Sequence, residues 1–145
     1  PLVSSSAASD VYKRQADGYG WLVIAETVVS DDKEQIQRAI REQIAKGAHL
    51  VLTTGGTGVA PRDVTPEAVK EIADRELPGF GEVMRIESMK ITKNAILSRN
   101  LAAAVGNALV ICLPGKPKGA VECLGFVEGA IPHCVEVVAG VPTSC

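Results

Sequence analysis

Residues 50–66 of the chain read Leu50-Val51-Leu52-Thr53-Thr54-Gly55-Gly56-Thr57-Gly58-Val59-Ala60-Pro61-Arg62-Asp63-Val64-Thr65-Pro66. The opening apolar run predicts a short buried strand. Three glycines within four positions follow, and they let the backbone turn sharply and approach a ligand without obstruction by a Cβ atom. Thr65 and Pro66 then predict a helix start, with a threonine N-cap before a proline at the first helical position. The stretch therefore predicts a strand, a glycine loop and a helix in direct succession.

A loop of this kind is suited to binding an anion, because unpaired amides and the positive end of a helix dipole both favour a phosphate. Asp63 lies within the predicted site. A carboxylate beside a phosphate requires a metal ion or a proton between them, so Asp63 is the first candidate for a functional residue. A Gly-Gly-x-Gly sequence fits equally well a tight turn that only joins a strand to a helix.

Two common phosphate loops are excluded by the residues that follow the glycines. The nucleoside-triphosphate loop requires a Lys-Ser or Lys-Thr pair, and none follows Gly58. The dinucleotide-binding loop requires a third glycine where Pro61 stands. The predicted loop is therefore of another kind.

The chain before this stretch predicts an alternation of strand and helix. Residues 21–29 predict a buried strand, and Ser30 or Asp31 is expected to cap the following helix, which Gly47 ends. A strand–helix–strand succession predicts a right-handed crossover in a parallel sheet. Because ligands bind at the carboxyl ends of such strands, Asp31 and the glycine loop are expected at the same rim, although a plain helix cap also explains Asp31.

The second half of the chain predicts a hairpin and a second loop. Residues 100–105 and 108–113 flank Gly106-Asn107, which is suited to a two-residue hairpin turn. The second arm runs into Pro114-Gly115-Lys116-Pro117-Lys118, whose lysines fit either a phosphate contact or simple solvation. These elements together predict an α/β fold.

Composition limits the classes of function. The 145 residues are enough for one domain, and 15 basic against 17 acidic residues produce no general attraction to nucleic acid or membranes. Aromatic residues make up only 3%, which disfavours base stacking. The evenly spaced Cys112, Cys123, Cys134 and Cys145 form no Cys-x-x-Cys pair, so we interpret them as structural thiols of a reducing, cytoplasmic setting.

Several motifs together resemble the molybdopterin adenylyltransferase family, which includes the Mog/MoaB-type proteins and the G domain of gephyrin. The motifs are Thr53-Thr54-Gly55-Gly56-Thr57-Gly58, Pro61-Arg62-Asp63-Val64-Thr65-Pro66-Glu67-Ala68, Asp74-Arg75-Glu76-Leu77-Pro78-Gly79-Phe80-Gly81-Glu82-Val83-Met84-Arg85, Ala95-Ile96-Leu97-Ser98-Arg99 and Leu113-Pro114-Gly115-Lys116-Pro117-Lys118. The resemblance extends from Asp17 to Gly140 without a gap.

The resemblance implies a three-layer α/β/α fold like that of the molybdopterin-binding domain, with a mostly parallel sheet and a β-hairpin. It implies a role in molybdenum cofactor biosynthesis, in which AMP from ATP is joined to molybdopterin with Mg²⁺ and diphosphate is released. Asp31 and Asp63 would be the catalytic residues and would hold the metal ion. The substrates would contact Thr54, Gly55, Gly56, Thr57, Gly58, Ser98, Pro114, Gly115 and Lys116.

The N-terminal residues match nothing in the family. Ser5 to Gln15 lack apolar periodicity and resemble the translation of a sequencing adapter. We therefore expect residues 1–15 to be a non-native leader without structure. Residues 16–145 would be the molybdopterin-binding domain, lacking the family's first strand and first helix.

The residues fit more than one function. Some proteins of the superfamily hold the pterin without adenylylating it, so a non-catalytic molybdopterin-binding protein is the main alternative. Gly55-Gly56-Thr57-Gly58 fits the adenylyltransferase better than the Gly-Gly-Val-Ser loop of the related molybdate-inserting domain. The resemblance also implies a homotrimer, with a contact to the molybdate-inserting enzyme.

Overall fold

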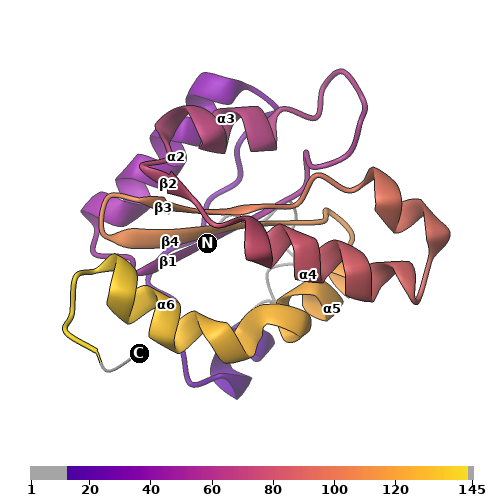
Figure 1. Ribbon diagram of the computed structural model, residues 1–145. Helices are drawn as coiled ribbons and strands as arrows, with labels where there is room; N and C mark the ends of the chain where they lie inside the picture. Colours follow the sequence, from indigo (N-terminus) through magenta and orange to yellow (C-terminus); the bar gives the residue numbers. More distant parts are fainter. Residues whose placement is uncertain (1–12, 144–145) are drawn as a thin grey trace.

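The computed structural model describes residues 13–143 of the chain (Figure 1). Its helices are α2 (Lys33–Ala45), α3 (Thr65–Ile72), α4 (Pro78–Met89), α5 (Pro117–Val127) and α6 (Ile131–Val138), with 3₁₀ turns η1 (Lys93–Leu97) and η2 (Glu128–Ala130). Its strands are β1 (Leu50–Thr54), β2 (Arg75–Glu76), β3 (Ala102–Val105) and β4 (Ala108–Leu113). Residues 13–18 are also helical.

The four strands form one mixed sheet in the order β1-β4-β3-β2. β1 pairs with β4 in parallel, while β3 pairs with both β4 and β2 in antiparallel fashion. The predicted hairpin is confirmed, since Val105 and Ala108 pair across the turn at Gly106-Asn107. The α/β class is also confirmed. Only one of the three pairings is parallel, so the sheet is less parallel than expected.

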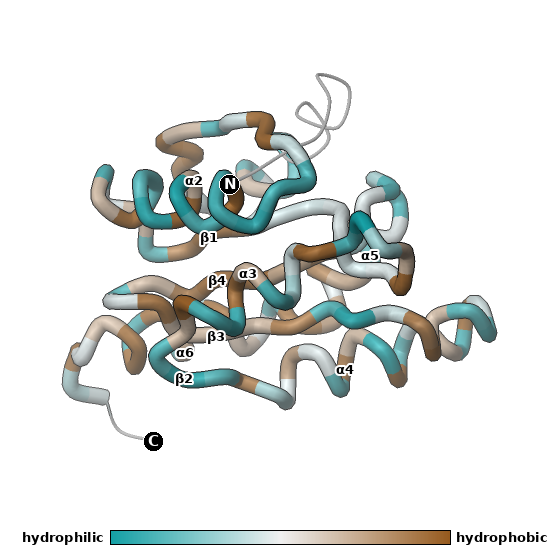
Figure 2. Tube along the Cα trace, turned by 90° about the horizontal axis from the view of Figure 1, so that it is seen from above, coloured by the Kyte–Doolittle hydropathy of each residue, from teal (hydrophilic) through white to brown (hydrophobic). Residues whose placement is uncertain are grey.

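Helices cover both faces of the sheet and complete the three layers (Figure 1). Val51 and Val110 point toward α2 and α3, whereas Leu52, Leu109 and Ile111 point toward α4, α5 and α6. This division follows from the alternation of side chains along a strand. Figure 2 shows brown and teal segments alternating along α2 and α4, as expected for helices with one apolar face.

The predicted strand over residues 21–29 is wrong. The segment contains only an isolated bridge at Thr27, and the side chain of Leu22 is 87% exposed. Apolar runs form strands where neighbouring strands accept their backbone hydrogen bonds and pack against their side chains. Within the described residues, β1 pairs only with β4, so the segment joins no ladder and remains an extended connection.

Two predicted helix caps lie one or two residues from their expected positions. Asp32, rather than Ser30 or Asp31, caps α2, because its Oδ2 accepts a hydrogen bond of 2.9 Å from the amide of Gln35. Thr65 is the first residue of α3, and Val64 is its N-cap. Thr65 is buried beneath the glycine loop, and its amide donates to the carbonyl of Gly56 at 3.2 Å.

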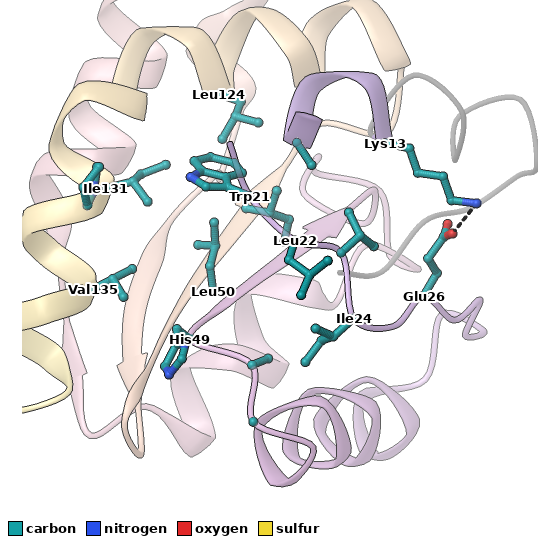
Figure 3. Close-up of a pocket in the computed structure, with 16 residues that line it drawn as sticks. Lys13, Trp21, Leu22, Ile24, Glu26, His49, Leu50, Leu124, Ile131 and Val135 are labelled. Carbon is teal, nitrogen blue, oxygen red and sulfur yellow. Dashed lines mark ion pairs between the residues drawn. The ribbon is translucent and has the colours of Figure 1, made fainter. Parts of the chain in front are cut away.

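Part of the expected unstructured leader is ordered. Residues 13–15 belong to a helical segment, in which the carbonyl of Gln15 accepts a hydrogen bond of 3.1 Å from the amide of Tyr19. Lys13 forms an ion pair of 2.8 Å with Glu26 (Figure 3). The expectation of no structure is therefore wrong for these three residues, because they form backbone and side-chain contacts. The remainder of the expected leader lies outside the described residues.

A mainly apolar cavity of about 470 Å³ lies beside β1. Figure 3 shows Trp21, Leu50, Leu124 and Ile131 around it, between the 21–29 segment and α6. None of the site residues predicted from the sequence lines this cavity. In residues 13–143 no helix combines the length and the apolar character that crossing a bilayer requires.

Candidate functional site

Two glycine-containing loops meet where the parallel strands β1 and β4 end. Thr54 and Leu113 are paired at the carboxyl ends of these strands. The amide of Gly55 donates to the carbonyl of Leu113 at 3.0 Å, and a Cβ atom on Gly115 would lie 3.3 Å from the Cα of Gly55. The structure thus brings together the two loops that the sequence predicted as substrate-binding, because their strands are neighbours in the sheet.

The backbone of the first loop requires glycine. Gly55 and Gly56 have φ angles of 93° and 68°, a region that residues with a side chain rarely adopt. A Cβ atom on Gly56 would collide with Oγ1 of Thr65 and lie 3.3 Å from its Cβ. A Cβ atom on Gly58 would lie 2.8 Å from Oδ2 of Asp63. The loop therefore keeps its shape only with small residues.

Gly56→Val is expected to raise the Kd for inorganic diphosphate by roughly 10-fold or more, because the side chain strains the backbone and displaces Thr65. The melting temperature should fall by only a few degrees. Isothermal titration calorimetry and thermal unfolding measure the two effects. Gly79→Val is the matched control, since a Cβ atom at Gly79 meets nothing within 4 Å. Equal affinity in Gly56→Val and the parent chain would contradict the prediction.

Four consecutive amides in this loop have no protein acceptor. In the described part of the chain, the backbone amides of Gly56, Thr57, Gly58 and Val59 donate no hydrogen bond. The N-terminus of α3 has fewer free amides than the sequence predicted. The amide of Thr65 donates to the carbonyl of Gly56, and Pro66 has no N–H group. Backbone amides left unpaired favour an anionic ligand, so the glycine loop is the part of this site that could donate hydrogen bonds to one.

Asp63 is held at the edge of these amides. Its Oδ2 accepts a hydrogen bond of 3.0 Å from the amide of Ala60, and its own amide donates to the Ala60 carbonyl at 2.9 Å. The side chain is half-buried, and its second carboxylate oxygen accepts no hydrogen bond from the described residues. This oxygen fits a hard cation such as Mg²⁺, which takes one or two carboxylates and retains several waters.

Asp31 lies just before another helix, α2. It is exposed, and nearby Lys33 pairs with Glu71 in the last turn of α3 at 2.6 Å. Asp63 instead precedes the first turn of α3, a helix about 12 Å long. Residues 13–143 contain no cluster of three or more potential metal ligands. The geometry therefore supports Asp63 as a metal ligand, whereas the case for Asp31 rests on the resemblance alone.

Arg99 is a site residue that the sequence analysis did not single out. Its amide donates to the carbonyl of Thr57 at 2.9 Å, and its guanidinium contacts Gly58 and Glu67. Ser98, which was predicted to contact the substrate, is thereby placed next to the glycine loop. The only signal in the sequence was the Ser98-Arg99 pair, because the partners of Arg99 lie more than 30 residues away.

The remaining predicted site residues lie at the ends of β1 and β4. Thr54 and Pro114 are half-buried, and Lys116 is exposed immediately before α5. The carbonyl of Lys116 accepts a hydrogen bond of 2.9 Å from the amide of Ala120, which fixes the start of that helix. Lys116 therefore follows the second loop directly and carries a positive charge that can offset negative charge on a ligand.

The thiols in the described part of the chain are free, and they are buried in Cys112 and Cys123 and half-buried in Cys134. Burial raises the pKa of the Cys112 thiol to about 12. Burial also raises the pKa of Cys123 and of Cys134. These side chains therefore remain protonated at neutral pH, which supports their interpretation as structural residues. Cys145 lies outside the described residues.

Unpaired loop amides and a carboxylate oxygen at the ends of parallel strands form an arrangement that is typical of phosphate-binding α/β domains. The chain belongs to the family described as "Probable molybdopterin binding domain", which matches residues 6–133.

Similar proteins and a similar solved structure are consistent with this family assignment. The chain is 46% identical over 114 residues to a molybdopterin adenylyltransferase of Helicobacter pylori strain J99. The aligned region covers 78% of this chain and 65% of the length of that relative. It is 38% identical over 161 residues to the molybdopterin adenylyltransferase of Haemophilus influenzae, covering 95% and 82% of the two chains. The crystal structure of the molybdopterin biosynthesis enzyme MoaB from Thermus thermophilus superposes with a TM-score of 0.87 at 38% identity, covering 99% of this chain and 96% of that one.

Proposed function

We propose that this protein is a molybdopterin adenylyltransferase of molybdenum cofactor biosynthesis. The observation that carries the proposal is the row of four unpaired amides at residues 56–59, bordered by the free carboxylate oxygen of Asp63. Two phosphorylated substrates require many oxyanion donors and a cation site close together. The names of the relatives from Helicobacter pylori and Haemophilus influenzae support this choice of reaction.

In this reaction an oxygen of the terminal phosphate of molybdopterin attacks the α-phosphorus of ATP. A new phosphorus–oxygen bond forms, the bond from the α-phosphorus to the bridging oxygen breaks, and diphosphate leaves with that electron pair. The protein contributes mainly alignment of the two substrates and stabilisation of negative charge. The amides of Gly56, Thr57 and Gly58 would hold phosphate oxygens, with Thr54 and Gly55 fixing the start of the loop.

The second loop would orient the other substrate. Gly115 lies against Gly55, so a ligand that spans both loops is held on two sides. Ser98 and Pro114 would contact the pterin, and the ammonium of Lys116 would offset the charge of its phosphate. Mg²⁺ would neutralise charge on the ATP phosphates when bound. Asp63 would hold this ion directly or through water, and Asp31 is included as a second ligand on the basis of the resemblance.

The direct test is to incubate the purified protein with molybdopterin, ATP and MgCl₂ and to follow adenylylated molybdopterin and diphosphate by chromatography. We expect both products in equal amounts, and none when EDTA replaces Mg²⁺. Binding of molybdopterin without either product would overturn the proposal in favour of a non-catalytic binding protein.

We further propose that the protein acts in the cytoplasm as a homotrimer and passes its product to the molybdate-inserting enzyme. Free thiols in the described residues suit a reducing compartment. Large apolar side chains are exposed on α4 and η1, including Ile86 at 59%, Ile96 at 66% and Leu97 at 53%. This surface fits a contact with other copies of the chain, because exposed apolar groups are commonly covered in oligomers.

The double variant Ile86→Glu/Ile96→Glu is expected to convert trimers to monomers, because two charges would be buried in each contact. Analytical ultracentrifugation measures the change in mass. Val137→Glu is the control, since this valine is 49% exposed on α6. A trimer that persists in the double variant, or a monomeric parent chain, would contradict the assignment of this surface.

A further inference from the structure

Arg99 connects three segments of the candidate site. Its Nε donates to the carbonyl of Gly58 at 2.8 Å, and its Nη2 donates to the carbonyl of Asp63 at 2.6 Å. Its backbone amide donates to the carbonyl of Thr57 at 2.9 Å. The residue before it is Ser98, so this one side chain and its backbone tie the 98–99 segment to both ends of the loop that contains Gly58 and Asp63.

Glu67 fixes the orientation of the guanidinium group. Nη1 of Arg99 lies 2.9 Å and 2.6 Å from the two carboxylate oxygens of Glu67, which belongs to the first turn of α3. An arginine has five N–H donors in a rigid plane, and most of those of Arg99 are used by Glu67, Gly58 and Asp63. The positive charge is therefore already matched within the protein, so Arg99 is unsuited to serve as the main phosphate ligand.

The hydrogen bonds to Arg99 fix the orientation of two peptide groups in the glycine loop. In a trans peptide the C=O and N–H groups point in opposite directions. The carbonyls of Thr57 and Gly58 point toward Arg99, so the amides of Gly58 and Val59 in the same peptide groups point away from it. These two amides are among the four without a protein acceptor.

We propose that Arg99, held by Glu67, is a positioning residue that turns the amides of the glycine loop toward the phosphate site and keeps Asp63 beside them. The inference rests on the proposed function for its catalytic consequence, but its structural part concerns anion binding alone. Without the guanidinium group, the carbonyls of Gly58 and Asp63 would lose their common donor, and the peptide group between Gly58 and Val59 could rotate. The carbonyl of Thr57 would keep its hydrogen bond from the backbone amide of residue 99. The loop would then offer a mixture of donors and acceptors to a phosphate.

The test compares two ion pairs on the same helix. Glu67→Gln weakens the hold on Arg99, whereas Glu71→Gln is the matched control because it removes the 2.6 Å pair with Lys33 at the other end of α3. Arg99→Lys keeps the charge but loses the planar set of donors. Each variant is titrated with inorganic diphosphate, and the ¹H–¹⁵N NMR signals of Gly56, Thr57, Gly58 and Val59 are followed. Thermal unfolding of each variant is recorded in parallel.

We expect the Kd for diphosphate to rise roughly 10-fold in Glu67→Gln and more in Arg99→Lys, with the signals of residues 58–59 already shifted before diphosphate is added. Glu71→Gln should retain the parent affinity and the parent signals. If Arg99 and Glu67 only stabilised the fold, Glu67→Gln and Arg99→Lys would lower the melting temperature equally and would not selectively shift the signals of these amides. Parent-like affinity and amide signals in both Glu67→Gln and Arg99→Lys would overturn the inference.

Activity then separates this inference from the proposed function. If the parent chain binds diphosphate at the loop amides but forms no adenylylated molybdopterin, the proposed function fails and the positioning role of Arg99 stands. If the parent is active, Glu67→Gln should raise the KM for ATP by roughly 10-fold and leave kcat within about a factor of three. An active Glu67→Gln variant with an unchanged KM would count against the positioning role.

Discussion

If Asp63 is the metal ligand that we propose, Asp63→Asn is expected to lower kcat for adenylylation by roughly 100-fold or more, because the charge that would hold Mg²⁺ against the substrate phosphates is removed. The substitution should preserve the loop, since the amide oxygen of asparagine can still accept the hydrogen bond from Ala60 that Oδ2 accepts now. Molybdopterin affinity should therefore remain within a few-fold of that of the parent. Steady-state kinetics at a series of Mg²⁺ concentrations, together with equilibrium binding of the pterin, measure both effects.

Asp74 provides the control for the Asp63 variant. Oδ2 of Asp74 also accepts a hydrogen bond from a backbone amide, at 2.7 Å from that of Gly106 in the hairpin turn. Asp74→Asn should retain parent activity. Asp31→Asn tests whether the second aspartate contributes to the reaction. Unchanged turnover of Asp63→Asn at saturating Mg²⁺ would show that this carboxylate is not a metal ligand.

The second large effect concerns the side of β1 that faces the cavity. β1 has one strand partner in the described part of the chain, and Leu22 and Ile24 beside it are 87% and 46% exposed. An unpaired strand edge beside apolar side chains promotes pairing with other chains. We propose that residues 16–145 form the domain, and we expect them alone to aggregate. The same residues carrying Leu22→Ser and Ile24→Ser should remain dispersed, because the apolar side chains beside the strand edge are then replaced by polar ones.

The control for this prediction is Val137→Ser/Val141→Ser, because these valines are 49% and 50% exposed in and after α6. Size-exclusion chromatography and light scattering of residues 16–145 and of both variants measure the association. Residues 16–145 that remain dispersed without any substitution would contradict the prediction.

A large part of the loop that forms the site could be predicted from the sequence because it depends on local rules. The apolar run from Leu50 to Thr54 forms β1, and Pro66 stands in the first turn of α3. Gly55 and Gly56 adopt positive φ angles, which explains why glycine occurs at both positions. The Gly106-Asn107 turn connects β3 and β4 as its two-residue length predicts. In each case the residues that determine the conformation are close together in the chain.

Contacts between distant segments could not be predicted in this way. The apolar run at residues 21–29 has the composition of a strand, but a strand also requires a neighbour that accepts its hydrogen bonds. The cap of α3 was misplaced because Thr65 is buried and its amide donates to the carbonyl of Gly56, a contact with another segment that local spacing does not predict. That Asp31 shares a rim with the glycine loop stays a prediction, since no hydrogen bond or ion pair among the described residues joins the two.

The residues by themselves therefore determined the α/β class, the glycine loop with Asp63 and the hairpin, since each depends on the spacing of residues within one segment. The tertiary structure alone decided that Gly115 lies against Gly55, and that Arg99 reaches Glu67 across 32 positions to hold the loop carbonyls. The physical reason is that hydrogen bonds and packing act over a few ångströms in space. A sequence specifies which groups can form them, but the folded sheet decides which groups come that close.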